Sequence, residues 1–283
     1  MLTIISISIF SCKKDDKLVT QDNYLGQEVS GTTDLDKQLY SIFVQPYNID
    51  VRYKWDQSNF ELQYTLVPPS ENKVLPYMKI VQKVWLDPYN AETGSQLFMK
   101  TYTPKQLILS GSGLLNSDGT SIIGLGEGGL DILLANINGT NLKDDNAVTD
   151  ILHLVNHEFT HILNQKKAYT IDFTKISPAA DYIAEWYNSQ VDPLSLGFIS
   201  GYARKDPNED FAEMVSWMLA WGKDGYEDYI NQSIDDPAYA IGIGKLRQKE
   251  AIVVDYFKKS YNIDFYSLQT RVHASIAAAT SAQ

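Results

Sequence analysis

Apolar and polar positions follow a helical period between residues 145 and 166 of the chain. Apolar side chains recur there at spacings of three and four, which places them on one face of a helix. They are Val148, Ile151, Leu152, Val155, Phe159 and Ile162. Asp144, Asp145 and Asn146 offer oxygens that cap a helix start, and Lys166 and Lys167 suit the negative end of the helix dipole. The pattern predicts a helix that buries one face in the core, while the side chains of the opposite face point away from the core.

Alternation and periodicity also divide the rest of the chain into short elements. We expect half-buried strands at 49–55 and 60–66, which can pair as a hairpin, and further strands at 106–109, 121–125 and 130–137. We expect helices at 35–43, 70–85, 178–188, 206–221, 245–261 and 264–276. Gly222 is expected to end the helix over 206–221. A run from Gly124 to Gly129 matches GxGxxG, but a strand-like segment follows it, so a glycine turn between strands is the preferred interpretation.

The second face of the 145–166 helix carries His157, Glu158 and His161 in the pattern HExxH. Residues i and i+4 lie one above the other on a helix, so both imidazoles leave the same face and can share one tetrahedral zinc ion. Glu158 is turned by about 100° from His157, where it can reach a water without binding the metal. The alternative is a buried helix with two hydrogen-bonded histidines. Three of the chain's four histidines fall in this helix, which favours the metal site.

A zinc hydrolase needs a third protein ligand and a carboxylate that orients a ligand histidine. The helix that starts at Asp206 carries Glu209 and Glu213 on one face, at i and i+4. We expect Glu209 to bind the metal and Glu213 to orient an imidazole. The alternatives are a capping box between Glu209 and Asp206, and a solvated helix charge at Glu213.

Two further residues, Glu185 and His153, have open roles. Glu185 also follows His161 and is a second candidate for the third ligand, although Ser189 rather than an acid lies four positions on. His153 precedes His157 by one turn and can be a fourth metal contact, a substrate-site group or a hydrogen-bonded neighbour. The metzincin continuation of HExxH is excluded, because Asn164 and Lys167 occupy the positions of its glycine and third histidine.

The N-terminus suggests export. Residues 1–12 form an apolar run that ends at Cys12, the only cysteine of the chain, and the run is too short to span a bilayer. We interpret it as a lipoprotein signal peptide with Cys12 as the lipidated residue, although no Lys or Arg precedes the run. Residues 13–34 are polar and read as a flexible tether. We expect residues 35–283 to form the functional domain, either as one large unit or as two lobes around a cleft.

The overall charge of the chain argues against one class of binding partner. The formal net charge is −11, which argues against the phosphate backbone of a nucleic acid as a partner. The charge suits an exported protein and does not identify a substrate.

The motifs together resemble a known enzyme group. HExxH followed by a second helix with Glu-x-x-x-Glu is similar to the gluzincin branch of the zincin metallopeptidases. The run Asn208-Glu-Asp-Phe-Ala-Glu213, together with the Cys12 segment, resembles zinc metallopeptidase lipoproteins of Bacteroidetes that are associated with SusD-type substrate import. The similarity is strongest from about residue 145 to residue 221. Lys13-Lys14-Asp15-Asp16 resembles the acidic export tag of Bacteroidetes surface lipoproteins.

This resemblance implies an α+β zincin-like fold, with a small mixed-sheet N-terminal lobe, a helical C-terminal lobe and the HExxH helix between them. It implies one zinc ion, a peptide or protein substrate, and an outer-membrane lipoprotein on the cell surface or periplasmic face, working beside a SusC/SusD-type complex. The catalytic domain of anthrax lethal factor is a more distant look-alike with a tyrosine at the place of Tyr202, whose hydroxyl would by that resemblance stabilise the oxyanion. The alternative is a loop tyrosine that packs on the surface. By family analogy, the strand over 130–137 would form the edge of the cleft, where an extended peptide can add to the sheet.

Two other functions remain open from the sequence. The protein can be a non-catalytic surface binding lipoprotein of a nutrient-import complex, or a metal-dependent hydrolase that acts on something other than a peptide. The intact Glu158 favours catalysis, because no structural task for it is evident.

Overall fold

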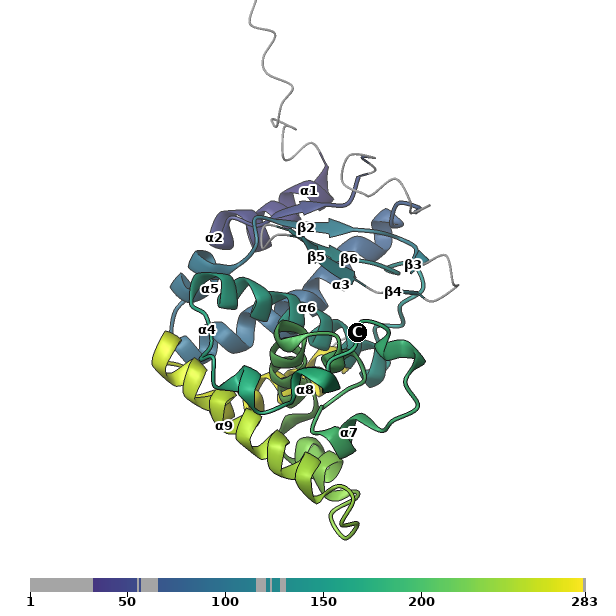
Figure 1. Ribbon diagram of the computed structural model, residues 1–283. Helices are drawn as coiled ribbons and strands as arrows, with labels where there is room; N and C mark the ends of the chain where they lie inside the picture. Colours follow the sequence, from purple (N-terminus) through teal and green to yellow (C-terminus); the bar gives the residue numbers. More distant parts are fainter. Residues whose placement is uncertain are drawn as a thin grey trace, which may run out of the picture.

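A computed structural model describes residues 33–54, 56, 66–115, 121–122, 124–127 and 131–281 of the chain (Figure 1). The predicted signal peptide, the tether up to residue 32 and the strand expected over 60–66, apart from Leu66, lie outside the described residues. Residues 33 and 34, which we assigned to the tether, belong to the first helix, since Thr33 caps α1 (Asp34–Leu39).

The principal sheet has four strands, drawn at one end of the molecule in Figure 1. They are β1 (Asp50–Arg52), β2 (Gln106–Leu109), β6 (Asp131–Leu134) and β5 (Gly124–Glu127), in the spatial order β1-β2-β6-β5. The first three are parallel, and β5 runs antiparallel to β6. A second, two-stranded sheet pairs β3 (Leu114–Leu115) with β4 (Ser121–Ile122).

These pairings confirm the strands over 106–109 and 130–137 and shorten the one predicted over 49–55. The segment predicted as a single strand over 121–125 contributes to two strands, β4 and β5. The expectation that the strand over 130–137 lies at the sheet edge is wrong, because β6 has β2 on one side and β5 on the other. The edge next to β6 is formed by β5, which belongs to the glycine-rich run.

Several helices precede the glycine-rich run in the chain, and one of them, η1, packs against β1. After α1 come η1 (Tyr40–Val44) and α2 (Gln45–Tyr47), so the predicted helix over 35–43 extends to residue 47. The predicted helix over 70–85 is also confirmed and longer: α3 (Glu71–Val81), η3 (Gln82–Leu86) and α4 (Asp87–Thr93) follow one another without a break. Gly94, with φ of 70°, ends α4 in a left-handed conformation, and α5 (Leu97–Tyr102) follows.

Two long helices form the centre of the molecule. The helix predicted over 145–166 is α6 (Asp145–Lys166), whose start is capped because Asp144 Oδ1 accepts from Asn146 N at 3.0 Å. All six residues of the apolar stripe are buried. The helix predicted over 206–221 is α8 (Pro207–Asn231), which packs along α6. Its helical geometry breaks at Gly222 as expected, with φ of 70° and ψ of −175°, but the chain resumes a helical course to residue 231.

The two C-terminal helices are confirmed as α9 (Ala240–Tyr261) and α10 (Phe265–Thr280). α10 packs against α8, α4 and α6, and thereby joins the C-terminal part of the chain to the N-terminal part. The described part of the chain is therefore mostly helical with a small sheet, which confirms the α+β class. Within it, no helix combines the length and apolarity that a membrane crossing would require.

The prediction of a helix over 178–188 is wrong. Short turns take its place, namely η5 (Ala179–Asp181) and η6 (Trp186–Asn188), while η4 (Phe173–Lys175), α7 (Pro193–Leu196) and η7 (Tyr202–Arg204) lie on either side. The cause is tertiary pairing: Ile183 N donates to Arg204 O at 2.7 Å, and the Arg204 guanidinium donates to Asp181 O and Ser189 Oγ. The N–H of Ile183 and the carbonyl of Asp181, which would form intrahelical hydrogen bonds in a helix, are thus bound to Arg204 of η7.

Candidate metal centre

The histidines of α6 face the start of α8. Because the apolar stripe of α6 is held in the core, the opposite face turns His157 and His161 toward this neighbour. The His157 side chain is 6% exposed and that of His161 is 25% exposed. The two Nε2 atoms lie 3.1 Å apart, which is the arrangement that the i, i+4 spacing predicts.

Glu209 completes this group from the first turn of α8. Asp206 fixes that turn, since its Oδ1 accepts from Asn208 N at 2.8 Å and from Glu209 N at 3.2 Å. The Glu209 side chain is then directed at α6, where its Oε2 lies 3.0 Å from His157 Nε2 and 3.1 Å from His161 Nε2. Three donor atoms from two helices therefore converge on one point.

The donor set fits a zinc ion. A tetrahedral zinc with ligands at about 2.0–2.1 Å holds those ligand atoms roughly 3.3 Å from one another. The three distances between these atoms are 3.0, 3.1 and 3.1 Å, so a small adjustment would admit the ion. Two imidazoles and one carboxylate leave a fourth position for water, as in catalytic rather than structural zinc sites.

The electrostatics of the group also favour a cation. Burial alone would lower the pKa of His157, but the carboxylates of Glu209 and Glu213 outweigh burial and raise it to about 10. Burial likewise opposes ionisation of Glu209, yet hydrogen bonds with His157, His161 and Lys205 hold its pKa well below the ordinary value. The carboxylates around His157 thus favour a positive charge at the place where a metal ion would bind.

Glu158 lies beside this group. It occupies the helix position after His157, is partly buried, and is close enough for its charge to contribute to the raised pKa of His157. It is not part of the ligand cluster that the described residues form. This is the relation that HExxH predicts between a general base and a ligand.

Glu213 lies one turn behind Glu209 and binds the far side of the same imidazole. Its Oε1 lies 2.8 Å from His157 Nδ1 and 3.0 Å from His153 Nε2. Its Oε2 accepts from Ser200 Oγ at 2.5 Å and from Trp217 Nε1 at 3.0 Å. If His157 uses Nε2 for a metal, its Nδ1 carries a proton, and Glu213 is placed to accept it. His153, His157 and Glu213 also lie close enough to hold a metal. Within this group His153 is hydrogen-bonded to Glu213, and His157 Nδ1 lies at ion-pair distance from the same carboxylate.

Tyr202 and Lys205 contact the other oxygen of Glu209. Tyr202 Oη donates to Glu209 Oε1 at 2.9 Å, and Lys205 Nζ donates to the same oxygen at 2.6 Å and to Tyr202 Oη at 3.1 Å. Burial and the Glu209 charge raise the pKa of Tyr202, so its hydroxyl keeps its proton at neutral pH. These contacts leave Oε2 alone for the imidazoles, and they bring Tyr202 to the rim of the candidate centre.

The structure separates the two candidates for the third ligand. Glu185 is exposed in a turn and belongs to neither metal-compatible group among the described residues. Glu209 belongs to the group that contains both motif histidines. Our sequence reasoning did not include Lys205, Ser200 and Trp217. Lys205 lies four positions before Glu209 and Trp217 four positions after Glu213, so helical spacing could have predicted both contacts. Ser200 lies in a loop, where no sequence pattern predicts its contact with Glu213.

Comparisons with known proteins point in the same direction. A family model described as "Putative zinc-binding metallo-peptidase" matches residues 28–266. A solved structure, of a "putative zinc-binding metallo-peptidase" from Bacteroides caccae, is 30% identical and superimposes with a TM-score of 0.71. That match covers 90% of this chain and 97% of the other. No curated protein matches the chain.

Proposed function

The chain belongs to this family of zinc-binding metallo-peptidases, and on that premise we propose that it hydrolyses peptide bonds with one zinc ion held by His157, His161 and Glu209. The observation that carries the proposal is the convergence of three ligand atoms from α6 and α8 to within 3.1 Å of one another. Such a set of two imidazoles and one carboxylate leaves room for water and substrate.

Glu158 is the general base in this proposal. A bound zinc ion supplies Lewis acidity, which polarises the scissile carbonyl and makes a water more acidic. Glu158 takes the proton of the attacking water and later passes it to the leaving amine. Its position beside His157, outside the ligand group, supports this role.

Side chains around the metal centre hold the proposed ligands in position. Glu213 fixes the His157 ring by holding Nδ1, and Ser200, Trp217 and His153 fix Glu213 in turn. Tyr202 has a protonated hydroxyl near the ligands, and it stabilises the oxyanion by hydrogen bonding once it turns from Glu209. Lys205 keeps Glu209 Oε1 occupied during this movement, so the carboxylate stays oriented.

The proposed location rests on the sequence. Cys12 is the lipidated residue, residues 13–32 are the tether, and the enzyme works at the outer membrane beside a SusC/SusD-type nutrient importer. Cys12→Ser should move the protein from the membrane fraction to the soluble fraction of the exported material. A variant that fractionates like the wild type would contradict the anchor and leave the enzyme proposal intact.

The enzymatic claim is tested with Glu158→Gln. The variant should keep one bound zinc and lose cleavage of a mixed peptide library by at least about a hundredfold, the range for a removed general base. Glu185→Gln makes the same chemical change at an exposed position outside both metal-compatible groups of the described residues and should cleave like the wild type. Unchanged turnover in Glu158→Gln would refute the mechanism. A wild type that binds zinc but cleaves nothing would favour a binding lipoprotein.

A further inference from the structure

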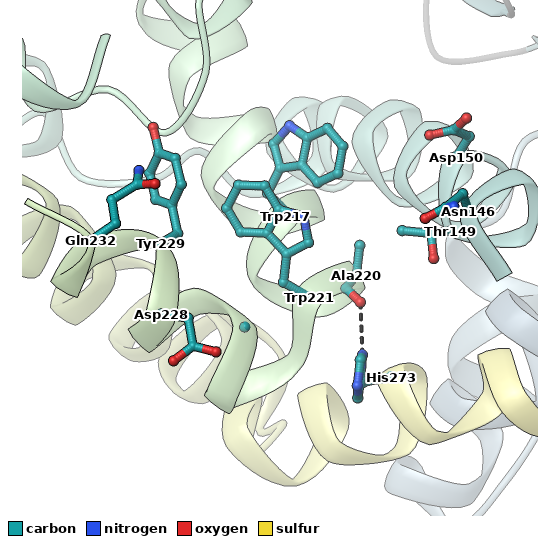
Figure 2. A pocket seen from close by; sticks show the side chains of 11 residues that line it. Asn146, Thr149, Asp150, Trp217, Ala220, Trp221, Asp228, Tyr229, Gln232 and His273 are labelled. Carbon is teal, nitrogen blue, oxygen red and sulfur yellow. Dashed lines mark hydrogen bonds between the residues drawn. The ribbon is translucent and has the colours of Figure 1, made fainter. Parts of the chain in front are cut away.

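A cavity of about 600 Å³ lies between α6, the second half of α8 and α10 (Figure 2). This volume falls within the range of sites that bind small molecules or side chains. Its walls include Trp217, Trp221 and Tyr229 from α8, Asp150 from α6 and Asp228 from α8. The cavity has no part in the proposed chemistry at the metal centre, although it begins beside it.

Aromatic rings form a continuous wall from the metal centre into this cavity. The His153 ring stacks on Trp217 at 3.9 Å between centroids, and Trp217 stacks on Trp221 at 4.7 Å. Tyr229 follows Trp221 at 4.9 Å with an interplanar angle of 37°. His153 in turn binds Glu213, so the ring wall starts at a residue that positions a proposed ligand.

Two carboxylates lie on opposite sides of the aromatic wall. Figure 2 shows Asp150 on one side of the indoles and Asp228 on the other. No Lys or Arg lines the cavity, and within the described part of the chain no Lys, Arg or His forms an ion pair with Asp150 or Asp228. His273 is occupied at one nitrogen, since its Nδ1 donates to Ala220 O at 2.8 Å. The cavity therefore combines flat apolar rings with two carboxylates that have no ion-pair partner in the described part of the chain.

We propose that this cavity binds the arginine side chain of a peptide. A guanidinium is flat, stacks on aromatic rings and forms paired hydrogen bonds with a carboxylate, so it matches both kinds of wall. A phosphate or carboxylate ligand would be repelled by Asp150 and Asp228. A neutral sugar would gain nothing from their charge.

The place of the cavity along α6 makes a peptide the appropriate source. Asp150 precedes His157 by seven positions, or roughly 10 Å along the helix. About three residues of an extended peptide span that length. A peptide with an arginine some three positions from the bond to be cleaved can reach both places, and this specificity role rests on the proposed peptidase function.

Binding is measured on the Glu158→Gln protein, so that no turnover interferes. The probes are the peptides acetyl-Ala-Arg-Ala-amide and acetyl-Ala-citrulline-Ala-amide, in which citrulline keeps the shape of arginine without its charge. Isothermal titration should give an affinity for the arginine peptide roughly tenfold higher, from the combined ion-pair and cation–ring contributions. Asp150→Asn and Asp228→Asn should each weaken its binding by about three- to fivefold.

Asp235→Asn is the matched control, because it removes the same charge at an exposed position outside the cavity. It should leave binding unchanged, and circular dichroism checks that all three variants fold. Equal affinity for the two peptides, or an equal loss in Asp235→Asn, would overturn the proposal. Arginine-dependent binding in a protein that cleaves no peptide would support the cavity and refute only the enzyme. Peptide cleavage without arginine-dependent binding would support the enzyme and refute the proposal for the cavity.

Discussion

Lys249 and Asp210 form an ion pair with no exposed side-chain surface, and breaking it should be strongly destabilising although it lies outside the metal centre. Lys249 Nζ lies 2.7 Å from Asp210 Oδ2 and donates to Gly197 O at 2.6 Å. Asp210 also accepts from Tyr182 Oη at 2.8 Å. The variant Lys249→Met preserves the length of the side chain and leaves Asp210 with Tyr182 alone.

The expected loss follows from the burial of the pair. Breaking a fully buried ion pair by removing one partner costs about 3–5 kcal/mol, because the remaining charge keeps its desolvation penalty. For a chain of this size, each kcal/mol lowers Tm by roughly 2–4 °C, so the midpoint should fall by about 10 °C. Removing both charges in Asp210→Asn/Lys249→Met should recover much of this loss.

The loss should also depend on pH. Burial raises the pKa of Asp210 from 3.8 to about 6 in the folded protein, against the opposing charge of Lys249. Its folded pKa therefore exceeds the unfolded value, so stability declines as pH rises through about 4 to 6 and the carboxylate must ionise. Without Lys249 the pKa rises further. The deficit of the single variant relative to the wild type should be largest near pH 7.5 and smaller at pH 5.

Urea unfolding followed by circular dichroism at these two pH values measures the effect. The control is Lys175→Met, which breaks an ion pair of the same 2.7 Å length whose side chains are 65% and 67% exposed. It should leave the unfolding midpoint unchanged. A loss below about 1 kcal/mol in Lys249→Met, or a deficit that grows toward pH 5, would refute the reasoning.

Three further changes have separable outcomes. Glu213→Gln removes the charge that faces His157 Nδ1 and should weaken zinc binding by roughly ten- to a hundredfold in competition with a chelator, whereas unchanged affinity would contradict its role. Gly222→Ala should lower Tm, because φ there is +70° and a Cβ would meet the His273 ring at 2.7 Å; an unaltered melting curve would be inconsistent with the kink. Phe159→Ala should cost about 3–5 kcal/mol in urea unfolding, since this buried ring contacts three other aromatic rings, and a loss under 1 kcal/mol would count against that packing.

Local chemistry made the two central helices predictable. The six apolar positions of α6 and the oxygens at Asp144 specify a face and a start, and the i, i+4 spacing then brings His157 and His161 together. Asp206 likewise specifies the start of α8 and thereby the direction of Glu209. These residues act on neighbours within one or two helical turns, so a single sequence contains the information.

Features that depend on distant contacts were not predictable. The segment 178–188 has helical periodicity, but Ile183 N and Asp181 O form hydrogen bonds with Arg204 instead of with their own helical neighbours. The local sequence around residue 183 does not predict this distant partner. The spatial order of strands also depends on the whole sheet, so β5 rather than β6 lies at the edge. Ser200 reaches Glu213 from a loop, and Asp150 and Asp228 meet at one cavity only because α6 and α8 pack together.

The central claim is that His157, His161 and Glu209 bind one zinc ion, and metal content tests it most directly. Mass spectrometry of protein lacking residues 1–12, purified without chelator, should find about one zinc per chain. Glu209→Ala should lose it and Glu185→Ala should retain it, because only Glu209 lies within 3.1 Å of both imidazoles. Zinc retained in Glu209→Ala but lost in Glu185→Ala, or a folded wild type without metal, would contradict the account.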